Sequence, residues 1–114
     1  MTKTKIQKIA EQLGWEVDWQ KDIKGNSSVW FSKASPFGQD FSFEVYFVTY
    51  KEIPEKVEEY YDNYDASYEA SLWLDSDGHG KNGAPYEMGD VYQDMKDCES
   101  MVYDLWEALR DEEE

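Results

Sequence analysis

The fold is decided by the stretch from Met88 to Arg110, which reads MGDVYQDMKDCESMVYDLWEALR. Its apolar residues recur at alternating steps of four and three, the spacing that places side chains along one side of an α-helix. The members of this apolar seam are Val91, Met95, Cys98, Val102, Leu105 and Leu109. We therefore expect a long amphipathic helix whose seam packs against the rest of the chain.

A line of aspartates accompanies the seam. Most of them come one position before a seam residue, which places them about 100° around the helix from it. They are Asp90, Asp94, Asp97, Asp104 and Asp111. Carboxylates four residues apart on a helix repel each other at a cost of about 0.2–0.5 kcal/mol per pair. The line is therefore either a solvated helix face or a surface that meets a cationic partner.

The composition favours one folded domain, residues 1–114, with an unusual charge. The chain has 26 acidic and 11 basic residues, a formal net charge of −15, yet 40% of it is hydrophobic and 17% aromatic. Residues 1–33 hold six lysines and four acids, whereas the remainder holds five bases and 22 acids. Such a charge speaks against direct binding to nucleic acid or to an anionic membrane, and it favours basic proteins as partners.

The only cysteine, Cys98, lies in the apolar seam, so no disulfide within the chain is expected. Its position predicts a buried thiol that behaves as a small hydrophobic side chain. No apolar run is long enough for a signal peptide or a membrane span. We therefore expect a cytoplasmic location, and the sequence leaves the oligomeric state open.

Alternation of apolar and polar residues predicts three strands. The first begins at Trp15, the second comprises Val29–Phe31, and the third spans residues 41–48. The third is the clearest, because Phe41, Phe43, Val45 and Phe47 point to one side. Since the connections are short, we expect an antiparallel meander whose apolar face the helices cover.

Helices are predicted on both sides of the strands. Residues 3–13 form an amphipathic segment that Gly14 ends, and Pro54 opens a second helix. Residues 66–74 fit a helix capped by Asp65, although their alternation also fits a strand, and residues 75–86 read as a loop. The prediction is an α+β fold: a three-stranded antiparallel meander with an N-terminal helix and two or three C-terminal helices on one face.

The second predicted helix mixes acids with tyrosines, which are favoured anchors at protein interfaces. Its candidate partner-binding residues are Glu58, Glu59, Tyr61, Asp62 and Tyr64. The alternative is that the rings pack on the sheet. Tyr60, Tyr61, Tyr64 and Tyr68 fall within nine residues. They cannot all face inward on one helix, so we expect at least one of them to be exposed.

Catalytic motifs are not found, so we do not expect an enzyme. His79 is the single histidine, and no serine or cysteine is spaced to form a nucleophilic triad with it. Asp75, Asp77 and Gly80 match positions one, three and six of a calcium loop, but Tyr86 occupies the position of the bidentate glutamate. A connector with local turn hydrogen bonds is the alternative. No cofactor is expected, and Asp75 and Asp77 are the only metal candidates.

Two segments carry a resemblance. They are Ser35-Pro36-Phe37-Gly38-Gln39-Asp40-Phe41-Ser42-Phe43 and Asp77-Gly78-His79-Gly80-Lys81-Asn82-Gly83-Ala84-Pro85-Tyr86. Together with the helix from Met95 to Leu109, they resemble small acidic proteins of unassigned function on bacterial mobile elements and phages. Such neighbourhoods are rich in anti-restriction and anti-CRISPR proteins, so the resemblance implies an anti-defence role. It implies no site residues.

The leading functional hypothesis is a non-enzymatic acidic inhibitor that mimics nucleic acid and binds a nuclease or CRISPR effector. Its carboxylates would lie where phosphates lie, and the basic groove of the target would attract them. The alternative is an adaptor or toxin-immunity domain whose acidity mainly gives solubility. A calcium-responsive module is a third interpretation.

Overall fold

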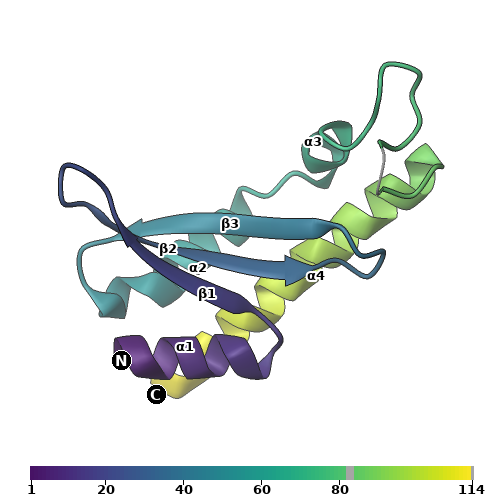
Figure 1. The fold of residues 1–114 in the computed structure, drawn as a ribbon. Helices are drawn as coiled ribbons and strands as arrows, with labels where there is room; N and C mark the ends of the chain where they lie inside the picture. The colour runs from purple at the N-terminus through teal and green to yellow at the C-terminus, as the bar shows by residue number, and fades with distance from the viewer. Residues whose placement is uncertain (82–83, 114) are drawn as a thin grey trace.

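The structure is a computed structural model that describes residues 1–81 and 84–113. It has an α+β fold, as the sequence predicts. The elements, in chain order, are α1 (Lys3–Gln12), β1 (Glu16–Lys21), β2 (Ser27–Ala34), β3 (Asp40–Phe47), the short 3₁₀ helix η1 (Tyr50–Glu52), α2 (Ile53–Asp62), α3 (Ala66–Ser71) and α4 (Met88–Glu113) (Figure 1).

The three strands form an antiparallel meander in the order β1-β2-β3, which confirms the predicted topology. The central strand is longer than the predicted Val29–Phe31. It begins at Ser27, which pairs with Lys21 and Phe47, and it ends at Ala34, which pairs with Asp40. The serine-rich ends of β2 have little strand propensity, so pairing with the neighbouring strands is what holds them extended.

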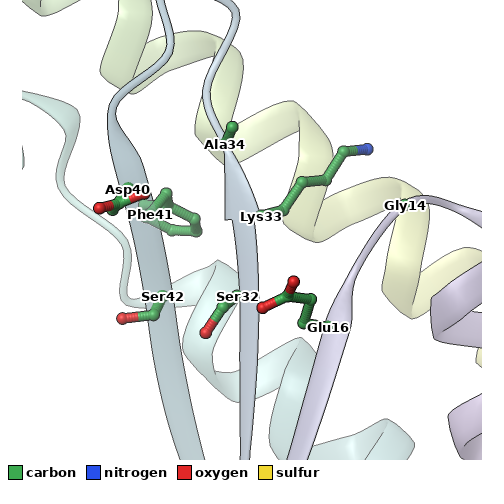
Figure 2. A pocket seen from close by; sticks show the side chains of 8 residues that line it. All are labelled: Gly14, Glu16, Ser32, Lys33, Ala34, Asp40, Phe41 and Ser42. Atoms are coloured by element: carbon green, nitrogen blue, oxygen red, sulfur yellow. The ribbon is translucent and has the colours of Figure 1, made fainter.

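The two faces of the sheet differ in their surroundings. Helices lie along one face, and α4 passes diagonally behind the sheet (Figure 1). The other face, which we name the open face, has no helix over it in the described part of the chain. Figure 2 shows Glu16, Ser32 and Ser42 side by side on the three strands, with helices behind them. The open face consists of Glu16, Asp18, Gln20, Ser28, Trp30, Ser32, Ser42, Glu44 and Tyr46.

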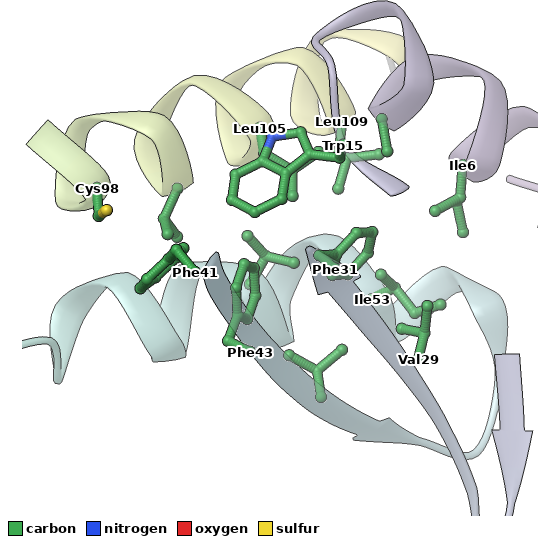
Figure 3. Packing of buried hydrophobic residues seen from close by; sticks show 14 of the residues in the cluster. Ile6, Trp15, Val29, Phe31, Phe41, Phe43, Ile53, Cys98, Leu105 and Leu109 are labelled. Atoms are coloured by element: carbon green, nitrogen blue, oxygen red, sulfur yellow. The ribbon is translucent and has the colours of Figure 1, made fainter. Parts of the chain in front are cut away.

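The core lies between the covered face and α4 (Figure 3). All six residues of the apolar seam have 0% exposure, which confirms the predicted long amphipathic helix. Aromatic rings fill the space beneath them. Trp15 meets Phe43 edge-on with ring centroids 5.7 Å apart, and Tyr60 stacks on Phe43 at 4.3 Å. Such pairs add about 0.5–1.5 kcal/mol each beyond the area they bury.

The helix ends follow their local sequence signals. Gly14 has φ +92°, a conformation that glycine adopts at low cost, and the amide of Trp15 turns back to donate to the Ala10 carbonyl at 3.0 Å. Pro54 lies in the first turn of α2. Asp65 caps α3 by accepting hydrogen bonds from the amides of Ser67 and Tyr68.

The predicted helix over residues 66–74 is too long. Helix α3 ends at Ser71, and Leu74 instead forms an isolated antiparallel bridge with Gly80. The Lys81 amide also donates to the Trp73 carbonyl at 2.7 Å. The loop that follows therefore binds the backbone of residues 73 and 74, which explains both the early helix end and the strand-like alternation there.

The reactivity of the Cys98 thiol provides a test of the core packing. Its side chain is fully buried, and burial, followed by the charges of Asp94 and Asp97, raises the pKa of the thiol to about 12. Because the thiolate is the reactive species, iodoacetamide at pH 8 should leave the native protein unmodified. The same reagent should modify Cys98 completely in guanidinium chloride, as measured by intact mass. Rapid modification of the native protein would contradict this packing.

Candidate functional site

Helix α4 distributes the predicted aspartates over different environments. Asp90, Asp104 and Asp111 are exposed, and Asp97 is half-buried and accepts a hydrogen bond from Gln93 at 3.1 Å. Asp94 has 0% exposure. The prediction that Asp94 belongs to a surface line of carboxylates is therefore wrong, and the line has a gap at its second member.

Asp94 ties α4 to the turn between β2 and β3. Its carboxylate accepts hydrogen bonds from the Ser35 hydroxyl at 2.6 Å, the Gln39 side-chain amide at 2.5 Å and the Phe37 backbone amide at 3.2 Å. The Ser35 hydroxyl also accepts from the Gln39 backbone amide at 3.0 Å. The line of aspartates runs along the margin of the buried side of α4, so a carboxylate there becomes buried wherever a loop closes over it.

Removing the charge of Asp94 tests this role. Asp94→Asn should lower the free energy of unfolding by about 2–3 kcal/mol, because buried hydrogen bonds to a charged group contribute about 1.5–3 kcal/mol each and an amide cannot replace them all. Asp104→Asn, the matched change at an exposed position of the same helix, should stay within about 0.5 kcal/mol of the parent. Urea denaturation measures both, and equal effects would contradict the structural role.

The acidic segment of α2 lies beside α4. Glu59 and Asp62 are exposed, Glu58 and Tyr61 are half-buried, and Glu59 pairs with Lys56 at 3.6 Å. The side chain of Tyr61 reaches α4, where its ring lies 5.4 Å from that of Tyr103. The two segments that the sequence singled out separately therefore meet on one side of the helical layer.

Aromatic rings continue from this meeting point along α4. Tyr103 lies 5.5 Å from Trp106, and the guanidinium of Arg110 lies 4.7 Å above the Trp106 ring. We name Tyr61, Tyr103 and Trp106 the aromatic row. Glu107 raises the pKa of the Tyr103 hydroxyl, first by hydrogen bonding and then by its charge. Tyr103 and Trp106 were not predicted as site residues from the sequence, although Trp106 flanks the apolar seam.

Of the remaining tyrosines in this region, Tyr60 and Tyr64 pack against the core. Tyr64, a predicted partner-binding residue, donates its hydroxyl hydrogen to the Met95 carbonyl at 2.7 Å and is part-buried. Burial raises the pKa values of both Tyr60 and Tyr64. Tyr68 is 60% exposed, which confirms that at least one of the four tyrosines faces solvent. Tyr64 therefore serves the fold, and Tyr61 remains the surface candidate.

Few of the carboxylates are neutralised inside the protein. Over residues 1–81 and 84–113, four ion pairs form: Lys5–Glu112 at 3.0 Å, Lys56–Glu59 at 3.6 Å, Lys96–Glu99 at 3.8 Å and Arg110–Asp111 at 3.5 Å. Asp90, Asp97 and Asp104 take part in none of them. Together with Glu58, Asp62 and the aromatic row, these three aspartates form what we name the helix surface.

The loop with the calcium-like spacing uses its aspartates locally. Asp75 accepts a hydrogen bond from the Ser76 amide at 3.1 Å, and Asp77 accepts one from the His79 amide at 2.9 Å. The His79 ring stacks on Tyr86 at 4.0 Å. Within the described residues, no three histidine, cysteine or acidic side chains are grouped as metal ligands. Asn82 and Gly83 of the second resemblance segment lie outside the described residues.

Comparisons with models of known families, with curated proteins and with solved structures found no match to this chain. None of the helices in the described part of the chain combines the length and the apolar character that a membrane crossing requires.

Proposed function

We propose that this protein is a non-enzymatic inhibitor that binds the basic surface of a nucleic-acid-handling protein, such as a nuclease or a CRISPR effector. The observation that supports this most is the helix surface, where α2 and α4 carry both carboxylates without an ion-pair partner and a row of aromatic rings. The carboxylates supply charge complementarity to a Lys- and Arg-lined groove. The rings supply broad contact area, as anchors at protein interfaces do.

The spacing along α4 also supports the proposal. With Asp94 buried, the remaining members Asp90, Asp97, Asp104 and Asp111 follow at intervals of seven residues. Seven residues of α-helix rise about 10.5 Å, and three base-pair steps of duplex DNA rise about 10 Å. The rise between neighbouring carboxylates along the helix axis is therefore close to that of three base-pair steps along a duplex, and α2 adds acidic side chains on the neighbouring helix.

Charge neutralisation on the helix surface tests the proposal. We expect the wild-type protein to bind a basic nuclease and to displace duplex DNA from it in a gel shift at low salt. The triple variant Asp90→Asn, Asp97→Asn, Asp104→Asn should bind at least tenfold more weakly. Wild-type binding should also weaken as salt rises, because ionic screening shortens the reach of exposed charges.

The matched control removes three charges elsewhere. Glu11→Gln, Asp75→Asn, Asp77→Asn changes the net charge equally but leaves the helix surface intact, so it should retain nearly wild-type binding. Equal loss in both triple variants would mean that only total charge matters. Absence of binding to every nuclease and CRISPR effector tested at low salt would contradict the proposal itself.

The aromatic row supports a second candidate, an adaptor or toxin-immunity domain whose acidity mainly provides solubility. In that case Tyr103→Ala should weaken partner binding by about tenfold or more, as loss of an interface anchor does. The triple aspartate variant should then bind almost normally. Isothermal titration of the two variants against the same partner separates the candidates, because nucleic-acid mimicry predicts the larger loss in the aspartate variant.

A further inference from the structure

Trp30 occupies the centre of the open face. It lies on the central strand, directly opposite Asp18 of β1 on one side and Glu44 of β3 on the other. Directly paired side chains in antiparallel strands have their Cβ atoms about 4.5–5.5 Å apart. The half-buried indole of Trp30 is therefore flanked by two carboxylates. The Glu44 carboxylate accepts a hydrogen bond from the Ser28 hydroxyl at 2.7 Å, and the Asp18 carboxylate accepts one from the Gln20 side-chain amide at 2.7 Å, so both keep their charge.

The open-face positions around Trp30 contain acids and hydroxyls but no lysine or arginine. The neighbouring row is Glu16, Ser32 and Ser42, and the row on the other side contains Tyr46, which is 54% exposed. None of the nine open-face positions is a lysine or arginine. Because the strands alternate, the side chains of Lys21 and Lys33 belong to the opposite face.

Three of the other four tryptophans have a cation near the ring, whereas Trp73 has none among the described residues. Lys33 lies 5.7 Å from the centre of the Trp15 ring, Lys3 lies 5.3 Å from that of Trp19, and Arg110 covers Trp106. Among the described residues, no such cation covers Trp30. Its ring nevertheless lies between two directly opposed carboxylates, which attract a cation placed over the indole.

A hollow adjoins this position. It has a volume of about 400 Å³, and its lining includes Glu16, Ser32, Asp40 and Ser42 (Figure 2). Lys33, the one cation in the lining, donates to the Leu13 carbonyl at 2.6 Å. The hollow therefore presents Glu16, Ser32 and Ser42 one row away from Trp30, and Asp40 two rows away, all with groups that accept hydrogen bonds.

We infer that the open face is a second docking surface, which binds an extended segment of a basic partner protein with arginines at alternate positions. One guanidinium stacks on Trp30 between Asp18 and Glu44, and the next enters the hollow beside Glu16. Rows of the sheet and alternate residues of an extended peptide have the same spacing, about 7 Å. Arginine fits better than lysine because its planar group both stacks on indole and binds carboxylates with two hydrogen bonds.

This inference does not depend on the helix surface, which lies on the other side of the core. The probe is a synthetic peptide, Gly-Arg-Ser-Arg-Ser-Arg-Gly, titrated into the ¹⁵N-labelled full-length protein. We expect the indole N–H signal of Trp30, assigned with Trp30→Phe, to shift. We also expect at least tenfold weaker binding to Trp30→Thr, and a similar loss in the double variant Asp18→Asn, Glu44→Gln, which keeps the indole and the shape of the face.

The helix-surface triple variant is the control and should bind the peptide as the wild type does. A peptide that shifts signals of α4 but not the indole of Trp30 would overturn the inference, as would equal affinity for wild type and Trp30→Thr. Equal affinity for the matching lysine peptide would contradict the assignment to a guanidinium. If the peptide result holds while nuclease binding fails, the open face stands and only the proposed inhibitor function falls.

Discussion

A three-stranded sheet with an aromatic face cannot remain stable in water unless something covers that face, and α4 is the element long enough to do so. The seam of α4, all of it buried, lies over Phe31, Phe41 and Phe43 of the sheet (Figure 3). Isolated small sheets are marginal because too little apolar area leaves water. The other helices then pack around α4, and this arrangement determines which surfaces remain outside.

The acid excess acts against the fold and is tolerated because the core offsets it. A net charge of −15 on 114 residues produces self-repulsion in the compact state. Few internal cations relieve it, since the four ion pairs of the described chain are solvent-accessible and such pairs contribute only about 0–1 kcal/mol each. Binding of a basic partner would relieve the repulsion that remains between the carboxylates, and this relief would add to the free energy of binding.

Local periodicity was sufficient to predict α4 and the third strand, because each has an apolar pattern that only one secondary structure satisfies. The short connections between the strands predicted the meander. The same periodicity misplaced Asp94. Like Asp90 and Asp97, Asp94 comes one position before a residue of the apolar seam. It is buried by a turn that lies 55–59 residues earlier in the chain. Long-range closure of this kind leaves no trace in the local pattern, although a serine and a glutamine in a predicted turn are suitable donors for a carboxylate.

The open face shows a different limit of sequence reasoning. Alternation alone predicted that Ser42, Glu44 and Tyr46 point away from the core. It did not show that Asp18 and Glu44 lie on either side of Trp30, because that depends on the register of two strand pairs. Likewise, the acidic tyrosine segment and the aspartate line were predicted separately, and the Tyr61–Tyr103 contact that joins them needed the packing angle of α2 and α4.

The two surfaces should act independently because of the distance between them. The shortest principal dimension of the molecule is 21 Å, whereas exposed charges are largely screened beyond about 8 Å at physiological ionic strength. A cation bound at Trp30 therefore adds little to the potential at Asp104. The core that separates the surfaces is closely packed and rich in aromatic rings. The two proposed contacts, at the helix surface and at the open face, would therefore not weaken each other.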